Sequence, residues 1–375
     1  MKYFIKTWII PRLVFVPFVM AKIILIFNRF RPRHWYVKKN ILLPNSLCIE
    51  AGLKGWESIE FKEIYLSACE YLGSKVVYKV QISTDIPYTK QVKQALETFH
   101  PTHYLYDPRT GSQKWFSGLV QSFKISILLN YHGVTPIALL TDLSVRTWRA
   151  QSSVITAKSG VVNCFMSPRL VFPVFPHKRL IGPSLMPFSV ATFNLIRRLS
   201  ELKTPDSKLG AIFIGSLYEP RTTTLKCINS TLHLKNLSLE IIGRELGSRR
   251  IPDDEYWLRI ISAKIVFTTA DQIKSKTKDW VWVKQIVYRY LEVLACGTLL
   301  VAPELPGLNR YFYPGIHYVP FVSSEDAAFL IEYYLINDNE RNAIAKKGQA
   351  MAQSLITSRS FWNYIDVALG KSSLL

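Results

Sequence analysis

Short apolar runs alternate with amphipathic stretches along most of the chain from residue 46 onward. Apolar runs typical of buried strands lie at 46–51, 75–82, 102–106 and 136–142, and another apolar run lies at 127–132. Between them, 59–72 and a segment near 89–98 place apolar residues at helical spacing. Strand, helix and strand in this order predict a parallel, doubly wound α/β sheet.

The same rhythm begins again after a polar stretch with proline and glycine at 203–210. Strands are expected at 211–215, 239–243, 264–269 and 298–303 with a short one near 317–321, and helices at 188–202 and from about Thr222, Pro252 and Lys284. We therefore place a domain boundary in the polar stretch. The sequence predicts two successive α/β domains, at 41–204 and 205–355.

Positive charge is concentrated in two parts of the chain, whose 375 residues carry a net charge of +20. Residues 1–40 contain nine Lys or Arg, residues 143–200 contain eight, and neither segment contains an acid. Such localisation indicates an anionic partner that meets particular surfaces. The two segments carry no recognised RNA or DNA motif, so we do not expect nucleic acid to be that partner.

The first 40 residues combine this charge with apolar and aromatic side chains. Residues 13–27 contain one charge, Lys22, and one proline, Pro17, which falls short of the roughly 20 apolar residues that span a membrane. The pattern favours a segment that lies in the membrane interface, with its basic side chains at anionic headgroups. A single tilted span and an ordinary core helix with a basic end remain the alternatives.

Two motifs in the second half could bind a phosphate-containing ligand. In FIGSLYEPR (213–221) a strand ends at Gly215, a tight loop begins at Ser216, and the helix that follows carries Arg221 in its first turn. Glycine lets a diphosphate approach the backbone, and a helix N-terminus offers free N–H groups. A structural glycine turn is the alternative for this motif.

The second motif is YRYLEVLACGTLLVAPELPG (288–307). Its helix carries Glu292 among apolar residues, with Arg289 one turn earlier, and a carboxylate in such a place needs a partner. The diol of a ribose would satisfy it, and so would a salt bridge to Arg289. The loop that follows the next strand contains Pro306 and Gly307, at the strand end where open α/β sheets bind ligands.

These motifs and their order resemble the C-terminal domain of group-1 glycosyltransferases, which have the GT-B fold. The similar pieces are FIGSLYEPR, EIIGR with Gly243, the Tyr-Trp pair at 256–257, the 288–307 motif and the block at 315–352. The resemblance implies two Rossmann-like domains that face each other across a cleft. It also implies that the last helix, at 356–375, returns to the N-terminal domain.

By the same resemblance, this half of the chain would bind a nucleotide-diphosphate sugar. Gly215, Ser216 and Arg221 would line the diphosphate site together with Gly243 and Arg289, Glu292 would hold the ribose, and Pro306 and Gly307 would border the sugar. The sequence departs from the family at Lys284, where many members carry a glutamate that faces the donor sugar. That departure leaves open which sugar is held and whether the transfer retains or inverts configuration.

The N-terminal domain offers candidates for a base that takes the proton of the acceptor. Asp142 ends an apolar run and His132 ends another, with His177 further along the chain. The sequence contains no metal-ligand motif, so no metal and no cofactor is expected. In this fold the helix dipole and basic side chains usually neutralise the leaving group.

The sequence thus predicts a transferase that is peripheral on the cytoplasmic face of a membrane and takes part in polysaccharide biosynthesis. Its acceptor would be a lipid-linked or cell-surface glycan. The alternative is a non-catalytic protein with a GT-B shell that binds a membrane or another polyanion, which Lys284 and the two basic segments motivate.

Overall fold

The described part of the chain forms two compact units in the computed structural model. It comprises residues 45–53, 59–107, 121, 124–125, 127–140, 159–162, 180–182, 184–202, 209–244, 251–270, 286–305 and 307–369. The N-terminal unit contains the described residues up to Ser184 and those from Trp362 onward, and the C-terminal unit contains Leu185–Phe361. The segment 1–40 lies outside the described residues.

The N-terminal unit is built on a parallel sheet whose strands follow the order β2-β1-β3-β4-β5-β6. The strands are β1 (Leu47–Leu53), β2 (Val77–Ile82), β3 (His103–Tyr106), β4 (Thr135–Leu140), β5 (Ser159–Val162) and β6 (Leu180–Ile181). Its helices include α4 (Ile59–Leu72), α5 (Tyr88–Phe99) and, from Trp362, the end of α15 (Ser358–Leu369), and residues 127–131 are also helical. Helix α5 buries Tyr88, Gln91, Val92, Ala95 and Leu96, which is the spacing of one helix face.

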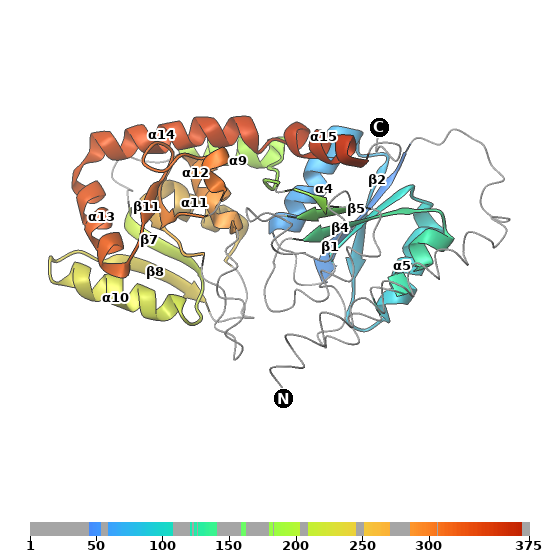
Figure 1. Ribbon diagram of the computed structural model, residues 1–375, viewed down its shortest axis with the longest axis horizontal. Coiled ribbons are helices and arrows are strands. Elements are labelled where there is room, and N and C mark those ends of the chain that lie inside the picture. Colours follow the sequence, from blue (N-terminus) through green and yellow to red (C-terminus); the bar gives the residue numbers. More distant parts are fainter. Residues whose placement is uncertain are drawn as a thin grey trace. The chain divides into compact units, whose positions relative to one another are not determined.

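The C-terminal unit has a second parallel sheet, in the order β8-β7-β9-β10-β11. Its strands are β7 (Leu209–Ser216), β8 (Leu239–Arg244), β9 (Ala263–Phe267), β10 (Leu299–Pro303) and β11 (Val319–Phe321). Its helices are α9 (Val190–Glu201), α10 (Arg221–His233), α11 (Asp253–Ser262), α12 (Tyr288–Cys296), α13 (Ser324–Ile336) and α14 (Asp338–Leu355), with a 3-10 turn η5 (Leu308–Arg310). Helices α10 and α13 pack together on one face of the sheet, and α11 and α12 pack with α9 on the other (Figure 1).

The predicted α/β architecture with two parallel sheets is confirmed. The apolar run at 127–132, which the sequence left unassigned, is helical through Tyr131 and leads into β4. One boundary differs from the sequence-based prediction. The chain passes from one unit to the other between Ser184 and Leu185, before α9, because α9 packs against α11 and α12.

Helix α15 contributes to both units. Its first turn belongs to the C-terminal unit, and from Trp362 it belongs to the N-terminal unit. The Trp362 ring is fully buried, and its Nε1–H donates to Ser67 Oγ on α4 at 2.9 Å.

Among the described residues, no helix is both long and apolar enough to cross a membrane.

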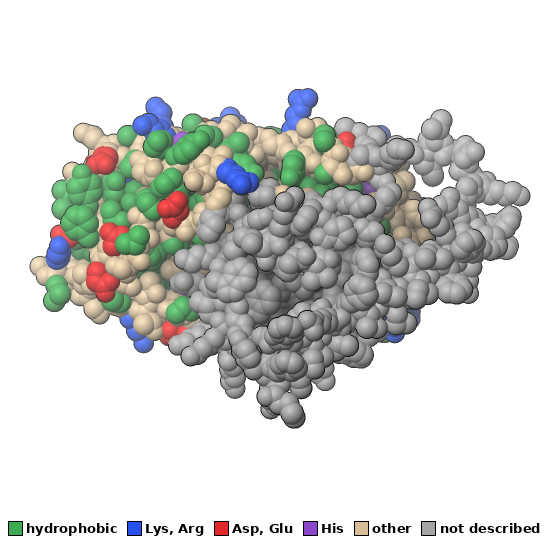
Figure 2. Space-filling view, viewed as in Figure 1, with side chains coloured by type: hydrophobic (Ala, Val, Ile, Leu, Met, Phe, Trp, Pro, Cys, Tyr) green, Lys and Arg blue, Asp and Glu red, His purple; other side chains and the backbone are tan. Residues whose placement is uncertain are grey.

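The outward face of α13 carries large apolar side chains. Phe329, Tyr333 and Ile336 are exposed on it at helical spacing, and exposed apolar side chains gather at this end of the C-terminal unit (Figure 2). Their exposure explains the weak amphipathicity of this helix, whose other face packs against the sheet.

Both sheets reverse their winding direction at the same place in the strand order. In the N-terminal unit β1 lies between β2 and β3, and in the C-terminal unit β7 lies between β8 and β9. The chain therefore winds one way to the second strand of each sheet and the other way to the third. Ligands of open α/β sheets bind at such a switch point, beyond the carboxyl ends of the strands.

A buried carboxyl group lies near the switch point of the N-terminal unit. Glu50 of β1 is fully buried and accepts hydrogen bonds from the hydroxyls of Tyr88 and Tyr104, the latter at 3.1 Å. Burial raises the pKa of Glu50 to about 8, and the charge of Asp107 at the end of β3 also raises it, against the opposing effect of the hydrogen bonds. In the sequence Glu50 is one acid in an apolar strand that precedes a glycine loop, a pattern that does not by itself mark a site.

This pKa predicts how stability depends on pH. The folded-state pKa of Glu50, about 8, lies above the value of roughly 4.3 for an unfolded chain. The stability that the neutral carboxyl contributes is complete below pH ~4.3 and is lost as the pH rises through 8. Gln does not ionise, so E50Q does not lose this stability, and each pH unit between the two pKa values corresponds to roughly 1.4 kcal/mol. The free energy of unfolding of E50Q minus that of wild type should therefore be larger at pH 9 than at pH 5.

The measurement is urea denaturation of both proteins across this pH range. Glu97→Gln is the matched control, because the Glu97 side chain is half exposed and pairs with Lys93 on the surface of α5. A difference between E50Q and wild type that stays constant with pH would contradict the prediction.

Candidate functional site

The switch point of the C-terminal unit holds two arginines on either side of Gly215. A Cβ built on Gly215 would lie 3.9 Å from Nη1 of Arg221 and 3.9 Å from Nη2 of Arg289, and 3.4 Å from the Phe213 ring. Gly215 has a φ of +155°, which L side chains rarely adopt. Glycine at the end of β7 therefore leaves open a space that two guanidinium groups face.

Arg221 is held from three sides. Its Nε–H donates to Thr269 Oγ1 at 2.9 Å, and Nη1 donates to the Ser216 carbonyl oxygen at 2.9 Å. The guanidinium lies 4.2 Å from the centroid of the Tyr218 ring. Arg221 is 8% exposed, and these contacts compensate for the burial of its charge.

Arg289 and Glu292 form an ion pair on the first two turns of α12. Arg289 Nη1 lies 3.2 Å from Glu292 Oε2, and both side chains are largely buried. The hydroxyl of Tyr256 on α11 donates to the same carboxylate oxygen at 2.5 Å. The salt bridge that the spacing left open is thus present, and it places Glu292 beside the guanidinium that faces Gly215.

The helix and strand ends around this cluster follow from the local sequence. Helix α12 ends at Gly297, whose φ of +68° is the left-handed cap conformation that glycine favours. Strand β10 follows at once and is buried along its first four residues. Thr269 comes two residues after β9, and its hydroxyl therefore reaches Arg221 across the switch point between β7 and β9.

Two further residues predicted for the donor site, Gly243 and Gly307, lie at the carboxyl ends of β8 and β10. Gly243 pairs in register with Gly215, but a Cβ there would lie 2.5 Å from the Leu217 side chain, so Gly243 makes room for Leu217. Gly307 has a φ of +81° and begins the η5 turn after β10. Pro306 and Lys284 lie outside the described residues.

The candidates for an acceptor-side base are not brought together. Asp142 and His177 lie outside the described residues. His132 precedes β4 and lies at its amino end, and Glu97 and His100 at the end of α5 act on its charge. Burial lowers the pKa of His132, but the edge on which it lies is opposite to the one that holds Glu50 and Asp107.

Two residues of the cluster were missed from the sequence. Thr269 and Tyr256 are separated along the chain from the arginine and the glutamate that they bind, and no local spacing indicates those contacts. The available signals were two threonines at the end of a strand and a tyrosine at the start of a helix. Among the described residues, no three His, Cys, Asp or Glu side chains gather as metal ligands.

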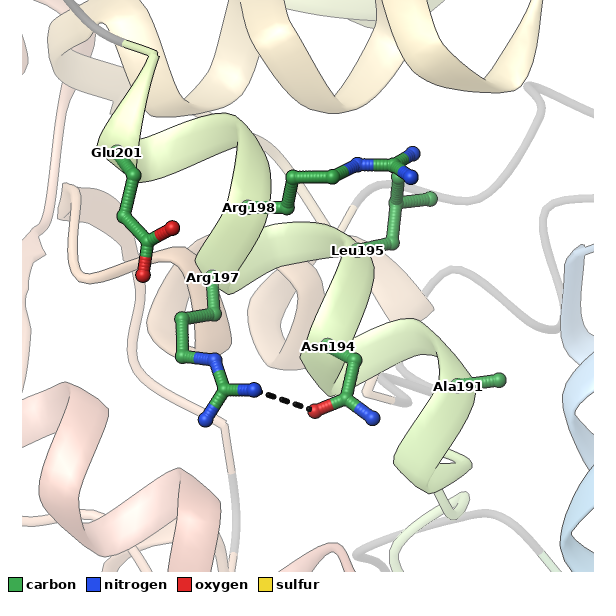
Figure 3. A pocket seen from close by; sticks show the side chains of 6 residues that line it. All are labelled: Ala191, Asn194, Leu195, Arg197, Arg198 and Glu201. Atoms are coloured by element: carbon green, nitrogen blue, oxygen red, sulfur yellow. Dashed lines mark hydrogen bonds between the residues drawn. The ribbon is translucent and has the colours of Figure 1, made fainter.

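A hollow of about 560 Å³ lies elsewhere in the C-terminal unit, along α9 (Figure 3). The described residues that line it are Ala191, Asn194, Leu195, Arg197, Arg198 and Glu201, all on one helix. Arg197 Nη2 donates to Asn194 Oδ1 at 3.3 Å, and the charged side chains are exposed. An open surface on a single helix, lined by both signs of charge, lacks the convergent polar groups of a ligand site.

Comparison with known proteins identifies the kind of domain that the C-terminal half resembles. Residues 224–365 match the family described as glycosyl transferase-like, and no curated protein matches the chain. This match confirms the resemblance that the motifs indicated for the C-terminal half.

Solved structures share the fold over most of the chain. The crystal structure of HepE from Anabaena in complex with UDP and glucose matches with a TM-score of 0.59 at 12% identity, over 87% of this chain and 100% of that one. Sucrose-phosphate synthase from Thermosynechococcus elongatus matches with 0.56 at 12% identity, over 87% and 98%. A glycosyltransferase from Rickettsia africae matches with 0.54 at 8% identity, over 88% and 99%. The chain therefore has the GT-B fold, as predicted.

The contact between Arg221 and Thr269 predicts a stability effect. Thr269→Val keeps the side-chain shape but removes the acceptor of the buried Arg221 Nε–H, which should lower the free energy of unfolding by roughly 1–3 kcal/mol. Urea denaturation measures it. Thr231→Val is the control, because the Thr231 hydroxyl donates to the Cys227 carbonyl oxygen within its own helix. An equal decrease in the free energy of unfolding in the two variants would show that the contact with Arg221 contributes no more to stability than a hydrogen bond within a helix.

Proposed function

We propose that this protein is a glycosyltransferase that binds a uridine diphosphate sugar in its C-terminal unit. The observation that carries the proposal is the pair of guanidinium groups around Gly215, at the switch point of the sheet. The glycosyl transferase-like match over 224–365 and the GT-B fold support it. HepE from Anabaena, which shares the fold, was crystallised with UDP and glucose and with UDP-glucose, which favours uridine as the base.

The geometry suggests a role for each residue of the cluster. A diphosphate over Gly215 would meet Arg221 and Arg289, and its negative charge would relieve the repulsion between them. Glu292 would accept hydrogen bonds from the ribose hydroxyls. During transfer, the bond between the sugar C1 and the β-phosphate oxygen breaks, and a bond from C1 to the acceptor oxygen forms. The guanidinium groups would stabilise the diphosphate as it leaves, without a metal ion.

The acceptor would be bound by the N-terminal unit, and its hydroxyl proton would pass to a base there. Asp142 remains the predicted base. His132 is a weaker candidate because it lies at the amino edge of the sheet, away from the switch point.

The donor site is tested by calorimetry of UDP and UDP-sugars in the presence of EDTA. Arg289→Ala and Glu292→Gln should each weaken binding tenfold or more, because each removes a charged hydrogen-bonding partner of the nucleotide. Arg259→Ala is the matched control, since Arg259 is an exposed arginine of α11 that pairs with Glu240 and Glu255.

Unchanged affinity in both variants would show that the site is assigned wrongly. If wild type binds no nucleotide in a panel that includes all common bases, the non-catalytic alternative is the correct one. Binding of UDP that is seen without EDTA but lost in its presence would contradict the metal-free mechanism.

We also propose that the protein is peripheral on a membrane surface, through residues 1–40. Nine basic and no acidic residues among apolar and aromatic ones support it. Deletion of residues 1–40 should abolish sedimentation with liposomes that contain anionic lipid, and the intact protein should bind neutral liposomes far less. Equal binding of the intact and shortened proteins to anionic liposomes would refute the proposal.

A further inference from the structure

Tyr256 contacts both charged residues of α12 with different parts of its side chain. Its hydroxyl donates to Glu292 Oε2 at 2.5 Å, and its ring lies 4.7 Å below the guanidinium carbon of Arg289. Tyr256 itself is 8% exposed and lies in the first turn of α11. One side chain from a neighbouring helix therefore supports the residues proposed to hold the phosphate and the ribose.

The ring of Tyr256 packs against Trp257, which belongs to a cluster of aromatic rings. Trp257 packs edge-on against it with centroids 5.4 Å apart, and Phe188 packs on Trp257 at 5.8 Å and on Tyr288 at 5.2 Å. Tyr288 is the first residue of α12. The aromatic cluster thus holds the starts of α11 and α12 together, which fixes Tyr256 relative to the residues that it supports.

Tyr256 and Arg289 meet the same oxygen of Glu292. The Tyr256 hydroxyl donates a hydrogen bond to Oε2 at 2.5 Å, and Arg289 Nη1 lies 3.2 Å from it in an ion pair. The directional hydrogen bond restrains the rotation of the carboxylate, and the aromatic face of Tyr256 restrains the guanidinium laterally. Removing the hydroxyl would free the carboxylate to rotate, whereas removing the ring would also free the guanidinium.

We propose that Tyr256 is a positioning residue of the donor site, whose hydroxyl orients Glu292 for the ribose and whose ring orients Arg289 for the diphosphate. The proposal rests on the function proposed above. It predicts that the two contributions separate: Tyr256→Phe keeps the ring and loses the hydroxyl, and Tyr256→Leu loses both.

The test compares the affinities of three nucleotides by calorimetry. The ratio of the affinity for UDP to the affinity for 2′-deoxy- or 3′-deoxy-UDP, here called the ribose ratio, measures the ribose contact. The ratio of the affinity for UDP to the affinity for UMP measures the β-phosphate contact. In Y256F the affinity for UDP should fall about tenfold, which is the effect of one hydrogen bond to a charged group. Its ribose ratio should fall toward one while its UDP to UMP ratio stays at the wild-type value. In Y256L both ratios should fall.

Tyr334→Phe is the matched control. It removes a tyrosine hydroxyl that donates to Glu340 Oε1 at 3.3 Å in the same unit, and both its ratios should equal those of wild type. A double variant Y256F/E292Q should show no smaller ribose ratio than E292Q alone, because the hydroxyl acts through Glu292. A lower melting temperature without a change in either ratio would show that Tyr256 is structural.

The outcomes separate the two proposals. If wild type binds UDP and Y256F keeps the full ribose ratio, the positioning role is refuted while the donor site stands. If Y256L keeps the wild-type UDP to UMP ratio, the ring has no role at the phosphate and the inference fails in that part. If wild type binds no nucleotide, the proposed function fails and this inference with it.

Discussion

The proposed donor site depends on two like charges placed at one edge of a sheet. Arg221 and Arg289 both face the space over Gly215, and neither is well exposed to water. Buried like charges repel each other, so the fold must supply compensating groups. These are the Thr269 hydroxyl, the Ser216 carbonyl, the carboxylate of Glu292 and three aromatic rings. An anion between the guanidinium groups would complete this compensation, which is why the arrangement favours a diphosphate.

The two units share one strand order but present different polar groups beside it. Each sheet has a switch point beside its first strand. In the C-terminal unit two arginines lie there, and among the described residues of the N-terminal unit Glu50 lies on β1 and Asp107 directly follows β3. Burial raises the pKa of Glu50 to about 8, so its carboxyl is largely neutral at neutral pH. Shared topology therefore determines where polar groups converge, while the residues at the strand ends determine whether that place is charged.

The sequence predicted the architecture well, because strand and helix periods are local signals. Gly215, Arg289 and Glu292 could be picked out as candidates, because a glycine turn and an Arg–Glu spacing are visible along one element. Thr269 and Tyr256 could not, because their contacts join separate elements. His132 illustrates a second limit. The sequence leaves the run at 127–132 unassigned, and its helical conformation through Tyr131 places His132 at the amino edge of the sheet. The edge on which a residue lies thus depends on tertiary context.

The central claim is that Gly215, Arg221 and Arg289 hold the diphosphate of the donor. A crystal structure of the protein with UDP tests it most directly. We expect phosphate oxygens within hydrogen-bonding distance of both guanidinium groups, above Gly215, with the ribose hydroxyls on Glu292. UDP bound elsewhere, for example in the hollow along α9, or phosphates that touch neither arginine, would contradict it.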